Sequence, residues 1–415
     1  MADHEVAVLK YLDDHRNELL EFTRELVAVP SMNPPGGEQA MADAVLARLS
    51  ELGLDQTEIR AKAPGRPNIF CRLGNSPFSL TLLLTGHLDT KPVGDRTRWC
   101  VDPFGADIVD GQLYGLGSGD MKAAIAAMVY AASALRSTQV PLGGNLLLLF
   151  TADEEAGSAY GADYLVEEKL VQADAALLGE PCGIRDEWEY ICLLSRGNCC
   201  FRVKVWGTQL HSSISDILPS VNASSKMAYV LWRMQRDLLP RIRYEPHPLC
   251  PQGPTLNVGV MVSGGVFFGV YPGYAEFACD LRTLPGMTRE GVAQDIEAFL
   301  DELRSEDPSL EVKLEFEPLP LGWIEPCEIP PDHPLVVATQ AAAERVFGTC
   351  PPLGCIPGTT DSPKLQFGLG IPTIPAFGPG RLPLAHSPNE HIAVESPLQA
   401  AKVYALCALN YLGVR

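Results

Sequence analysis

Residues 146–157 read LLLLFTADEEAG, an apolar run followed directly by three carboxylates. An uninterrupted apolar run of this kind predicts a strand buried on both faces, as in the sheet of an α/β protein. Like charges at the end of a buried strand repel one another and lose hydration, so they need compensation. The stretch therefore predicts a strand whose carboxyl end faces a cation, with a solvated acidic turn as the alternative for the triplet taken alone.

The same arrangement recurs in two other apolar segments. Residues 79–90, SLTLLLTGHLDT, predict a buried strand that stops where His87 and Asp89 appear, and residues 173–181, ADAALLGEP, predict another that ends at Glu180. In open α/β sheets, ligands bind at the carboxyl ends of the strands. We therefore expect these side chains to lie near the acidic triplet.

A glycine-rich turn leads into an alanine-rich helix within residues 113–137, LYGLGSGDMKAAIAAMVYAASALRS. This pattern predicts Asp120 at the N-cap or in the first turn of that helix. The run GLGSG at residues 115–119 also invites a dinucleotide-binding interpretation. Asp120 stands where that motif has its third glycine, however, and its carboxylate would press against the pyrophosphate. The sequence therefore disfavours nucleotide binding.

Chain length and a change of pattern predict two domains. At 415 residues the chain exceeds the size at which one hydrophobic core usually stops growing. Between about Ser195 and Leu319, short strands and helices follow in the order β-α-β-β-α-β, which is typical of a ferredoxin-like domain. We expect residues 1–194 and 320–415 to form an α/β domain with a mixed sheet flanked by helices, and residues 195–319 to form an inserted ferredoxin-like α+β domain.

Composition argues against several classes of partner. The net charge of −19, from 32 basic and 51 acidic residues, repels nucleic acid and anionic lipid over most of the surface. No window approaches the roughly eighteen apolar residues that span a bilayer, and the N-terminus has no signal-peptide core. The twelve cysteines include no C-x-x-C pair, which favours free thiols in a reducing compartment. We therefore expect a cytoplasmic protein without nucleic-acid or membrane partners.

The polar side chains at the strand ends have the chemistry of a metal centre, because carboxylate and imidazole groups bind hard and borderline cations. Five residues can give two metals three protein ligands each if one carboxylate bridges: His87, Asp120, Glu155, Glu180 and His386. Adjacent side chains at a strand end diverge, so Glu154 and Glu155 cannot share one role. One of them can bind metal while the other stands free as a general base.

Five motifs in order resemble those of one known family. They are GHLDT, GLGSGDMK, TADEEAG, GEP and AHSPNE, and they are similar to motifs of the acetylornithine deacetylase, succinyl-diaminopimelate desuccinylase and carboxypeptidase G family of di-metal zinc metallopeptidases. The resemblance covers nearly the whole chain. It implies a zinc-peptidase-like catalytic domain in residues 1–194 and 320–415, and a lid and dimerisation domain in residues 195–319. It also implies a homodimer.

The resemblance assigns a role to each strand-end residue. The implied metal ligands are His87 and Glu180 on one ion, Glu155 and His386 on the other, and Asp120 as the bridge. Glu154 is implied as the general base. Asp89 is implied as the carboxylate that orients His87.

The resemblance also implies three functional residues in the inserted domain. GTQLHSS is similar to the segment whose histidine reaches the active site of a partner subunit and stabilises the oxyanion, which here is His211. TLNVG and DLRT resemble the segments that hold the substrate's carboxylate, through Asn257 and Arg282. An arginine fork matches a carboxylate with two hydrogen bonds. A salt bridge to Asp280 or Glu276 is the alternative for Arg282.

The expected function is that of a metal-dependent amidohydrolase: a deacylase, carboxypeptidase or dipeptidase. The expected cofactors are two divalent ions, zinc or else cobalt or manganese, with a metal-bridged water from which Glu154 takes a proton. The expected substrate is an N-acyl amino acid or small peptide with a free carboxylate. The alternatives are a hydrolase of a non-peptide aromatic amide or amine in the same fold, and a non-catalytic metal- or metabolite-binding protein. Glu154 argues against the second, since binding alone has no use for a free base.

Overall fold

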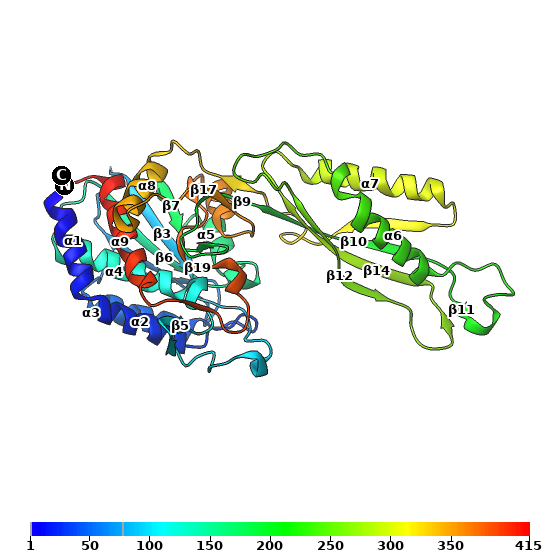
Figure 1. The fold of residues 1–415 in the computed structure, drawn as a ribbon, viewed down its shortest axis with the longest axis horizontal. Coiled ribbons are helices and arrows are strands. Elements are labelled where there is room, and N and C mark those ends of the chain that lie inside the picture. The colour runs from blue at the N-terminus through cyan, green and yellow to red at the C-terminus, as the bar shows by residue number, and fades with distance from the viewer. Residues whose placement is uncertain (1, 77–78) are drawn as a thin grey trace. The chain divides into compact units, whose positions relative to one another are not determined.

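The computed structural model describes residues 2–76 and 79–415, and the chain divides into two compact units. Unit 1 consists of Met1–Ser195, Glu328–Ile356 and Thr360–Arg415, and unit 2 consists of Arg196–Cys327 and Pro357–Thr359. Figure 1 shows the course of the chain through each unit.

Unit 2 extends beyond the predicted inserted segment, 195–319, at its C-terminal side. The additional residues pair with the start of the unit's sheet. The backbone N–H of Asn198 donates to the oxygen of Ile324 at 3.0 Å, and the N–H of Ile324 donates back at 2.7 Å. The predicted role of this unit as a lid and dimerisation domain stays a prediction.

Unit 1 is built on a six-stranded mixed sheet. In spatial order its strands are β1 (Thr57–Ala61), β2 (Pro67–Leu73), β6 (Asn145–Thr151), β3 (Thr81–His87), β7 (Ala175–Leu178) and β18 (Thr373–Ile374). The pairs β6–β3, β3–β7 and β7–β18 are parallel, whereas β1–β2 and β2–β6 are antiparallel. The predicted mixed sheet is therefore confirmed, with β1 and β2 as strands that the sequence patterns did not predict.

The helices of unit 1 are α1 (Ala2–Asp14), α2 (Arg16–Ala28), α3 (Gln39–Glu51), α4 (Ala123–Ser137), α5 (Ala162–Glu167), α8 (Pro334–Phe347) and α9 (Ser396–Leu412). Three helices precede β1, and the N-terminal two are separated by a turn at His15. Helix α4 packs against α9, and both contact β3 (Figure 1). The side chains of α4 are buried from Ala123 to Leu135, and its many alanines permit this close packing.

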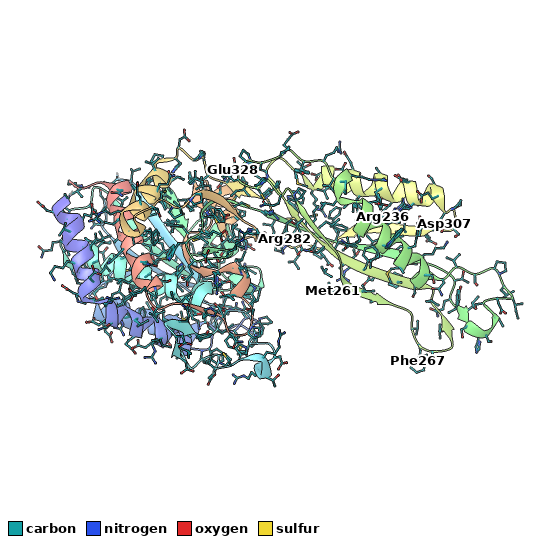
Figure 2. The ribbon with its side chains drawn as sticks, viewed as in Figure 1. Arg236, Met261, Phe267, Arg282, Asp307 and Glu328 are labelled. Carbon is teal, nitrogen blue, oxygen red and sulfur yellow. The ribbon has the colours of Figure 1, made fainter. Side chains whose placement is uncertain are left out.

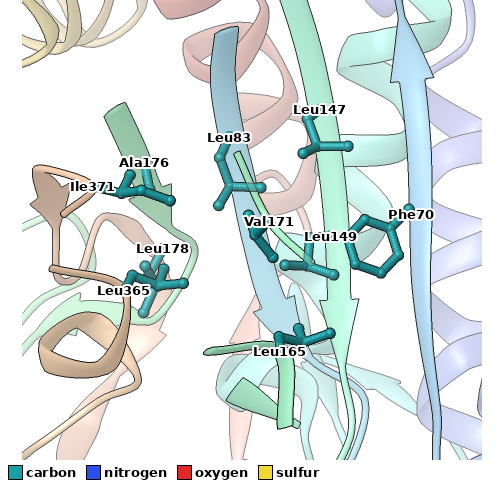
Figure 3. Close-up of a cluster of buried hydrophobic side chains, with 10 residues drawn as sticks. All are labelled: Phe70, Leu83, Leu147, Leu149, Leu165, Val171, Ala176, Leu178, Leu365 and Ile371. Atoms are coloured by element: carbon teal, nitrogen blue, oxygen red, sulfur yellow. The ribbon is translucent and has the colours of Figure 1, made fainter. Parts of the chain in front are cut away.

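A buried apolar cluster joins the strands β2, β3, β6 and β7 to α5 and to the segment 365–371 (Figure 3). Its members are Phe70, Leu83, Leu147, Leu149, Leu165, Val171, Ala176, Leu178, Leu365 and Ile371. Side chains alternate along a strand, so Leu146 and Leu148 point to the opposite face, where they are also buried. The strand predicted from the leucine run is thus buried on both faces.

Short strands attach the C-terminal segment to the middle of the chain. Strand β19 (Gly378–Arg381) pairs with β8 (Pro181–Gly183), and β20 (His391–Ala393) joins β5 (Gln112–Tyr114) and β4 (Ile108–Val109). Strand β17 (Leu353–Ile356) pairs with β9 (Ile191–Ser195). His386 lies in the connection between β19 and β20, so these pairings determine where it is held.

Unit 2 has the predicted element order β-α-β-β-α-β. Along the chain the elements are β10 (Gly197–Trp206), α6 (Ala223–Asp237), β12 (Thr255–Gly264), β14 (Tyr274–Thr283), α7 (Arg289–Glu306) and β15 (Glu311–Phe316). The strands form an antiparallel sheet in the order β12, β14, β10, β15. A separate two-stranded ribbon joins β11 (Leu210–His211) to β13 (Val270–Tyr271).

Two further predictions concern membrane-spanning helices and the state of the cysteines. Of the helices described here, none combines the length and apolar composition needed to span a bilayer. The twelve cysteines are free thiols. Cys199 is buried and Cys200 is partly exposed, as expected for neighbours on opposite faces of β10.

Candidate active site

Three strands of the unit 1 sheet end at one edge with the predicted polar side chains. Strand β3 ends at His87, β6 ends at Thr151 shortly before the turn Glu154–Ala156, and β7 ends at Leu178 just before Glu180. Strand β3 lies between β6 and β7 and is parallel to both. The predicted convergence of these strand ends is therefore confirmed.

Asp120 lies in the first turn of a short π-helical segment, Ser118–Lys122, which runs directly into α4 at Ala123. It therefore lies at the predicted helix start, but its own backbone is not helical. Its φ of −121° and ψ of 87° lie outside the helical region. The physical reason is that a side chain distant in sequence, Glu390, binds the N–H groups of this turn.

Glu390 holds the turn that carries Asp120. Its buried carboxylate accepts hydrogen bonds from the backbone N–H groups of Gly117 at 3.0 Å, Gly119 at 2.9 Å and Asp120 at 3.0 Å. Burial raises the pKa of Glu390 to about 8, and these three N–H groups oppose the rise. The contact sets the direction in which the Asp120 side chain leaves the backbone.

Asp120 places one carboxylate oxygen against each of two histidines. Its Oδ1 lies 2.9 Å from Nε2 of His87, and its Oδ2 lies 3.2 Å from Nε2 of His386. Oε1 of Glu155 lies 3.0 Å from Nε2 of His386, and Oε1 of Glu180 lies 3.7 Å from Nε2 of His87. The five predicted ligands thus form two groups, one around each histidine, that share Asp120.

This set of donors fits divalent metal ions. Ligand atoms of His87, Asp120 and Glu155 lie within 4.8 Å of one another, and all three residues are buried, as is Glu180. Buried carboxylates packed this closely require cations, and imidazole with carboxylate oxygen suits zinc, cobalt or manganese. Lys91 supplies positive charge from the chain itself, because its Nζ lies 3.1 Å from Oε2 of Glu155.

The carboxylates favour the protonated form of both histidines. Burial lowers the pKa of His386, but its hydrogen bonds to Asp120 and Glu155 outweigh burial and raise the pKa to about 10. The pKa of His87 is also raised well above its ordinary value, because Asp120 and Glu180 outweigh burial there. A metal ion needs neutral imidazole, so it must displace these protons.

Glu154 stands beside the five ligands without being tied to them. Its backbone N–H donates to Oδ1 of Asp89 at 3.2 Å, but its carboxylate forms no hydrogen bond or ion pair with any residue in the described part of the chain. Burial raises its pKa to about 8; His87 opposes the rise, while Asp361 and Glu155 add to it. A free carboxylate with such a pKa can take up and return a proton near neutral pH.

Asp89 faces both His87 and the acidic turn. Nδ1 of His87 lies 2.9 Å from the backbone oxygen of Asp89 and 3.6 Å from its Oδ1. The carboxylate also accepts hydrogen bonds from the backbone N–H groups of Glu154 at 3.2 Å and Glu155 at 3.1 Å. The predicted contact of Asp89 with His87 thus involves its backbone oxygen as well as its carboxylate. The contact of Asp89 with the acidic turn was not predicted.

The other predicted residues, His211, Asn257 and Arg282, belong to unit 2. His211 is exposed, and its Nδ1 lies 2.7 Å from Oγ of Ser213. Arg282 donates to Oδ2 of Asp280 at 2.9 Å, which is one of its two alternative contacts. Asn257 is exposed on β12 opposite Asp280 of β14. The functional roles of these three residues stay predictions.

Three residues around the site were not singled out from the sequence: Asn33, Lys91 and Glu390. Lys91 directly follows GHLDT, and Glu390 ends AHSPNE, so both lie within or beside the motifs. Asn33 belongs to NPPGG, which indicates only a turn. Their partners are far away in the sequence, so no local pattern identifies these contacts.

Replacing Glu390 with glutamine should weaken the Asp120 side of the site. Glutamine keeps the shape but turns an NH2 group toward one of three backbone donors, which leaves a buried donor unsatisfied at a cost of about 1–3 kcal/mol. We expect a lower Tm and metal affinity reduced roughly 10- to 100-fold in calorimetric titration. Glu395→Gln is the control, because Glu395 is an exposed acid paired with Arg16. Equal metal affinities in the two variants would contradict the role of Glu390.

Loading the protein with metal should release protons. At pH 7 both histidines are protonated in the metal-free protein, so binding two ions should release at least two protons per chain. Metal affinity should therefore rise as the pH rises from 7 towards 10, the pKa of His386. Calorimetry in buffers of different ionisation enthalpy measures this release. Binding without proton release would contradict the raised pKa values of the two histidines.

A protein-family model and a curated relative match the chain over most of its length. The model described as peptidase family M20/M25/M40 matches residues 83–410. The acetylornithine deacetylase of Salmonella arizonae is 32% identical over 381 residues, which cover 90% of this chain and 92% of that enzyme. The family model includes the ends of β3, β6 and β7 and the segment that carries His386.

Solved structures show the same fold. Human carnosine dipeptidase 1 superposes with a TM-score of 0.75 at 22% identity, covering 98% of each chain. An M20 family metallo-carboxypeptidase from Sulfolobus solfataricus gives 0.72 at 21% identity, covering 95% of this chain and 99% of that one. A dinuclear metal-binding M20 peptidase from Bacillus subtilis gives 0.68 at 15% identity, covering 97% and 100%. The chain therefore belongs to peptidase family M20/M25/M40, whose deacetylases and peptidases are hydrolases acting on C–N bonds.

Proposed function

We propose that the protein is a metal-dependent amidohydrolase that cleaves the amide bond of an N-acyl amino acid or small peptide with a free carboxylate. The observation that carries the proposal is the position of Asp120, which faces His87 with one oxygen and His386 with the other, while Glu154 stands free beside them. The 32% identity to an acetylornithine deacetylase supports the acyl amino acid as the substrate class.

The proposed cofactors are two divalent ions, zinc or else cobalt or manganese. His87 and Glu180 would hold one, His386 and Glu155 the other, and Asp120 would bridge them. When bound, such ions act as Lewis acids that polarise a carbonyl oxygen and lower the pKa of water. The clustering of buried carboxylates at this edge supports the assignment.

Glu154 acts in the proposed mechanism as the proton carrier. Its carboxylate takes a proton from the attacking water and returns it to the nitrogen of the leaving amine. Asp89 fixes the backbone from which Glu154 projects. His211 is proposed to donate to the developing oxyanion, and Arg282 with Asn257 to bind the substrate's carboxylate. Because Arg282 already pairs with Asp280, the substrate would compete with that acid.

Glu154→Gln should abolish turnover while leaving metal binding intact. Glutamine has the shape of glutamate but cannot accept the proton, so we expect kcat to fall by at least about 10²- to 10⁴-fold. Amine release should be measured over a panel of N-acyl amino acids, dipeptides and aromatic amides, beside the exposed control Glu168→Gln. Turnover of the aromatic amides alone would favour the alternative substrate class. A wild-type protein that binds two metals but releases no amine from any compound of the panel would favour the binding-protein alternative.

We propose further that the protein forms a homodimer through strand β12 of unit 2. This strand is at one edge of its sheet, and three successive apolar residues on it, Val260, Met261 and Val262, are 52%, 54% and 56% exposed. Figure 2 labels Met261 on β12 and Phe267 in the loop that follows. An exposed apolar edge strand invites pairing with a second strand, and a two-fold axis would let the same edge of another copy supply it.

Met261→Lys should weaken this dimer, because it places a charge on the pairing edge. We expect the dimer dissociation constant to rise at least about 10-fold, as measured by sedimentation velocity over a range of concentrations. Ile59→Lys is the matched control. Ile59 is 50% exposed on β1, the edge strand of the other sheet. A dimer weakened by the control and not by Met261→Lys would place the interface on unit 1.

A further inference from the structure

Asn33 lies behind the turn that carries Glu154 and Glu155, and it precedes the segment matched by the family model. Its side chain is buried, with 2% exposure. The backbone N–H of Asn33 donates to the oxygen of Thr90 at 2.7 Å, and the N–H of Thr90 donates to the oxygen of Ser31 at 3.0 Å. These bonds fix Asn33 against the segment that leaves β3.

The side-chain amide of Asn33 joins two buried carboxylates. Its Nδ2 donates to Oδ2 of Asp89 at 2.9 Å and to Oδ1 of Asp153 at 2.8 Å. The two acids are 1% and 3% exposed. An asparagine NH2 group has two hydrogens, so both are used here. Without this amide, two buried carboxylates would each lose a donor and would repel each other.

The two bridged carboxylates hold the acidic turn at different points. Asp89 binds the backbone N–H groups of both glutamates of the turn, as described above. Asp153 accepts a hydrogen bond from the N–H of Tyr160 at 3.1 Å, on the far side of the turn. The φ of Asp153 is 69°, a left-handed conformation that is unfavourable for a residue other than glycine. The surrounding contacts must therefore maintain it.

Arg66 is a cation that binds some of the acids in this network but not Asp89. Arg66 donates to Glu38 through Nε at 2.7 Å and Nη2 at 2.9 Å, and to Oδ1 of Asp153 at 2.5 Å. Asp89 is not among these partners of Arg66. The connection from Arg66 and Asp153 to Asp89 runs through the amide of Asn33.

We propose that Asn33 is a positioning residue for the hydrolytic reaction: by bridging Asp89 and Asp153, it fixes the direction in which Glu154 and Glu155 leave their turn. This inference rests on the roles proposed above for the two glutamates. Asn33 acts through the backbone of the turn and is not placed against the substrate. Its loss should therefore lower turnover and metal affinity while KM stays nearly constant.

Asn33→Asp tests the proposal, because aspartate has the same shape but lacks both hydrogens. Asn33→Ser is a second, uncharged variant with a single donor. Asn145→Asp is the matched control. Asn145 is also buried, but it lies at the start of β6, away from the acidic turn. Its amide donates to the oxygen of Ser76 and to Oγ1 of Thr81, and its oxygen accepts from the N–H of Ser76.

The first measurement is amide hydrogen exchange in a peptide that covers Glu154 and Glu155, in the metal-free protein, so that it does not depend on activity. We expect faster exchange in both Asn33 variants than in Asn145→Asp. Metal affinity should fall roughly 10- to 100-fold and kcat by a similar factor, with KM within about twofold of wild type. The control should keep kcat within about threefold even if its Tm falls.

Unchanged exchange at the two glutamates in the Asn33 variants would overturn the inference, as would an equal loss of kcat in the control. Should Asn33→Asp not fold, Asn33→Ser decides on the same readouts. Failure of the proposed function has a different signature: the wild type would bind no metal, or Glu154→Gln would still turn over substrate. The exchange experiment tests the positioning of the turn in either case.

Discussion

Mutual repulsion among buried carboxylates governs the edge of the unit 1 sheet where β3, β6 and β7 end. Four acids gather there: Asp120, Glu155 and Glu180, which are buried, and Glu154, which is half-buried. Groups of like charge held this close and this far from water are unstable unless cations compensate them. Two protonated histidines and Lys91 compensate part of this charge in the chain itself. Divalent ions would replace the protons, and the same charge cluster would then become a site for polarising an amide.

Three more acids surround this edge and have a different task. Glu390, Asp89 and Asp153 direct their oxygens at backbone N–H groups of the turns that carry Asp120 and the two glutamates. Their oxygens bind backbone N–H groups that neither helix nor sheet pairing satisfies, so these acids fix irregular backbone. The turns held in this way bring ligand atoms of Asp120 and Glu155 within 4.8 Å of each other and of His87.

The fold of this family does not by itself specify a substrate. Solved structures of a dipeptidase and a metallo-carboxypeptidase have this fold. The chain is also related in sequence to a deacetylase. The residues at the carboxyl ends of β3, β6 and β7 suit amide hydrolysis in general, because they include candidate metal ligands and a free base. Selection among acyl groups and amines has to come from residues outside that edge, and the predicted carboxylate-binding pair lies in unit 2.

The sequence by itself determined the buried strands, the element order of unit 2 and the polar side chains at the strand ends. Apolar runs such as Leu146 to Leu149 leave few conformations open, and the motifs carry their ligands at fixed distances from those runs. Only the tertiary structure decided the rest. The conformation of Asp120 depends on Glu390, and the acidic turn depends on Asn33. Such contacts join residues far apart in the chain, and hydrogen bonds to backbone groups leave no periodic pattern in the sequence that could announce them.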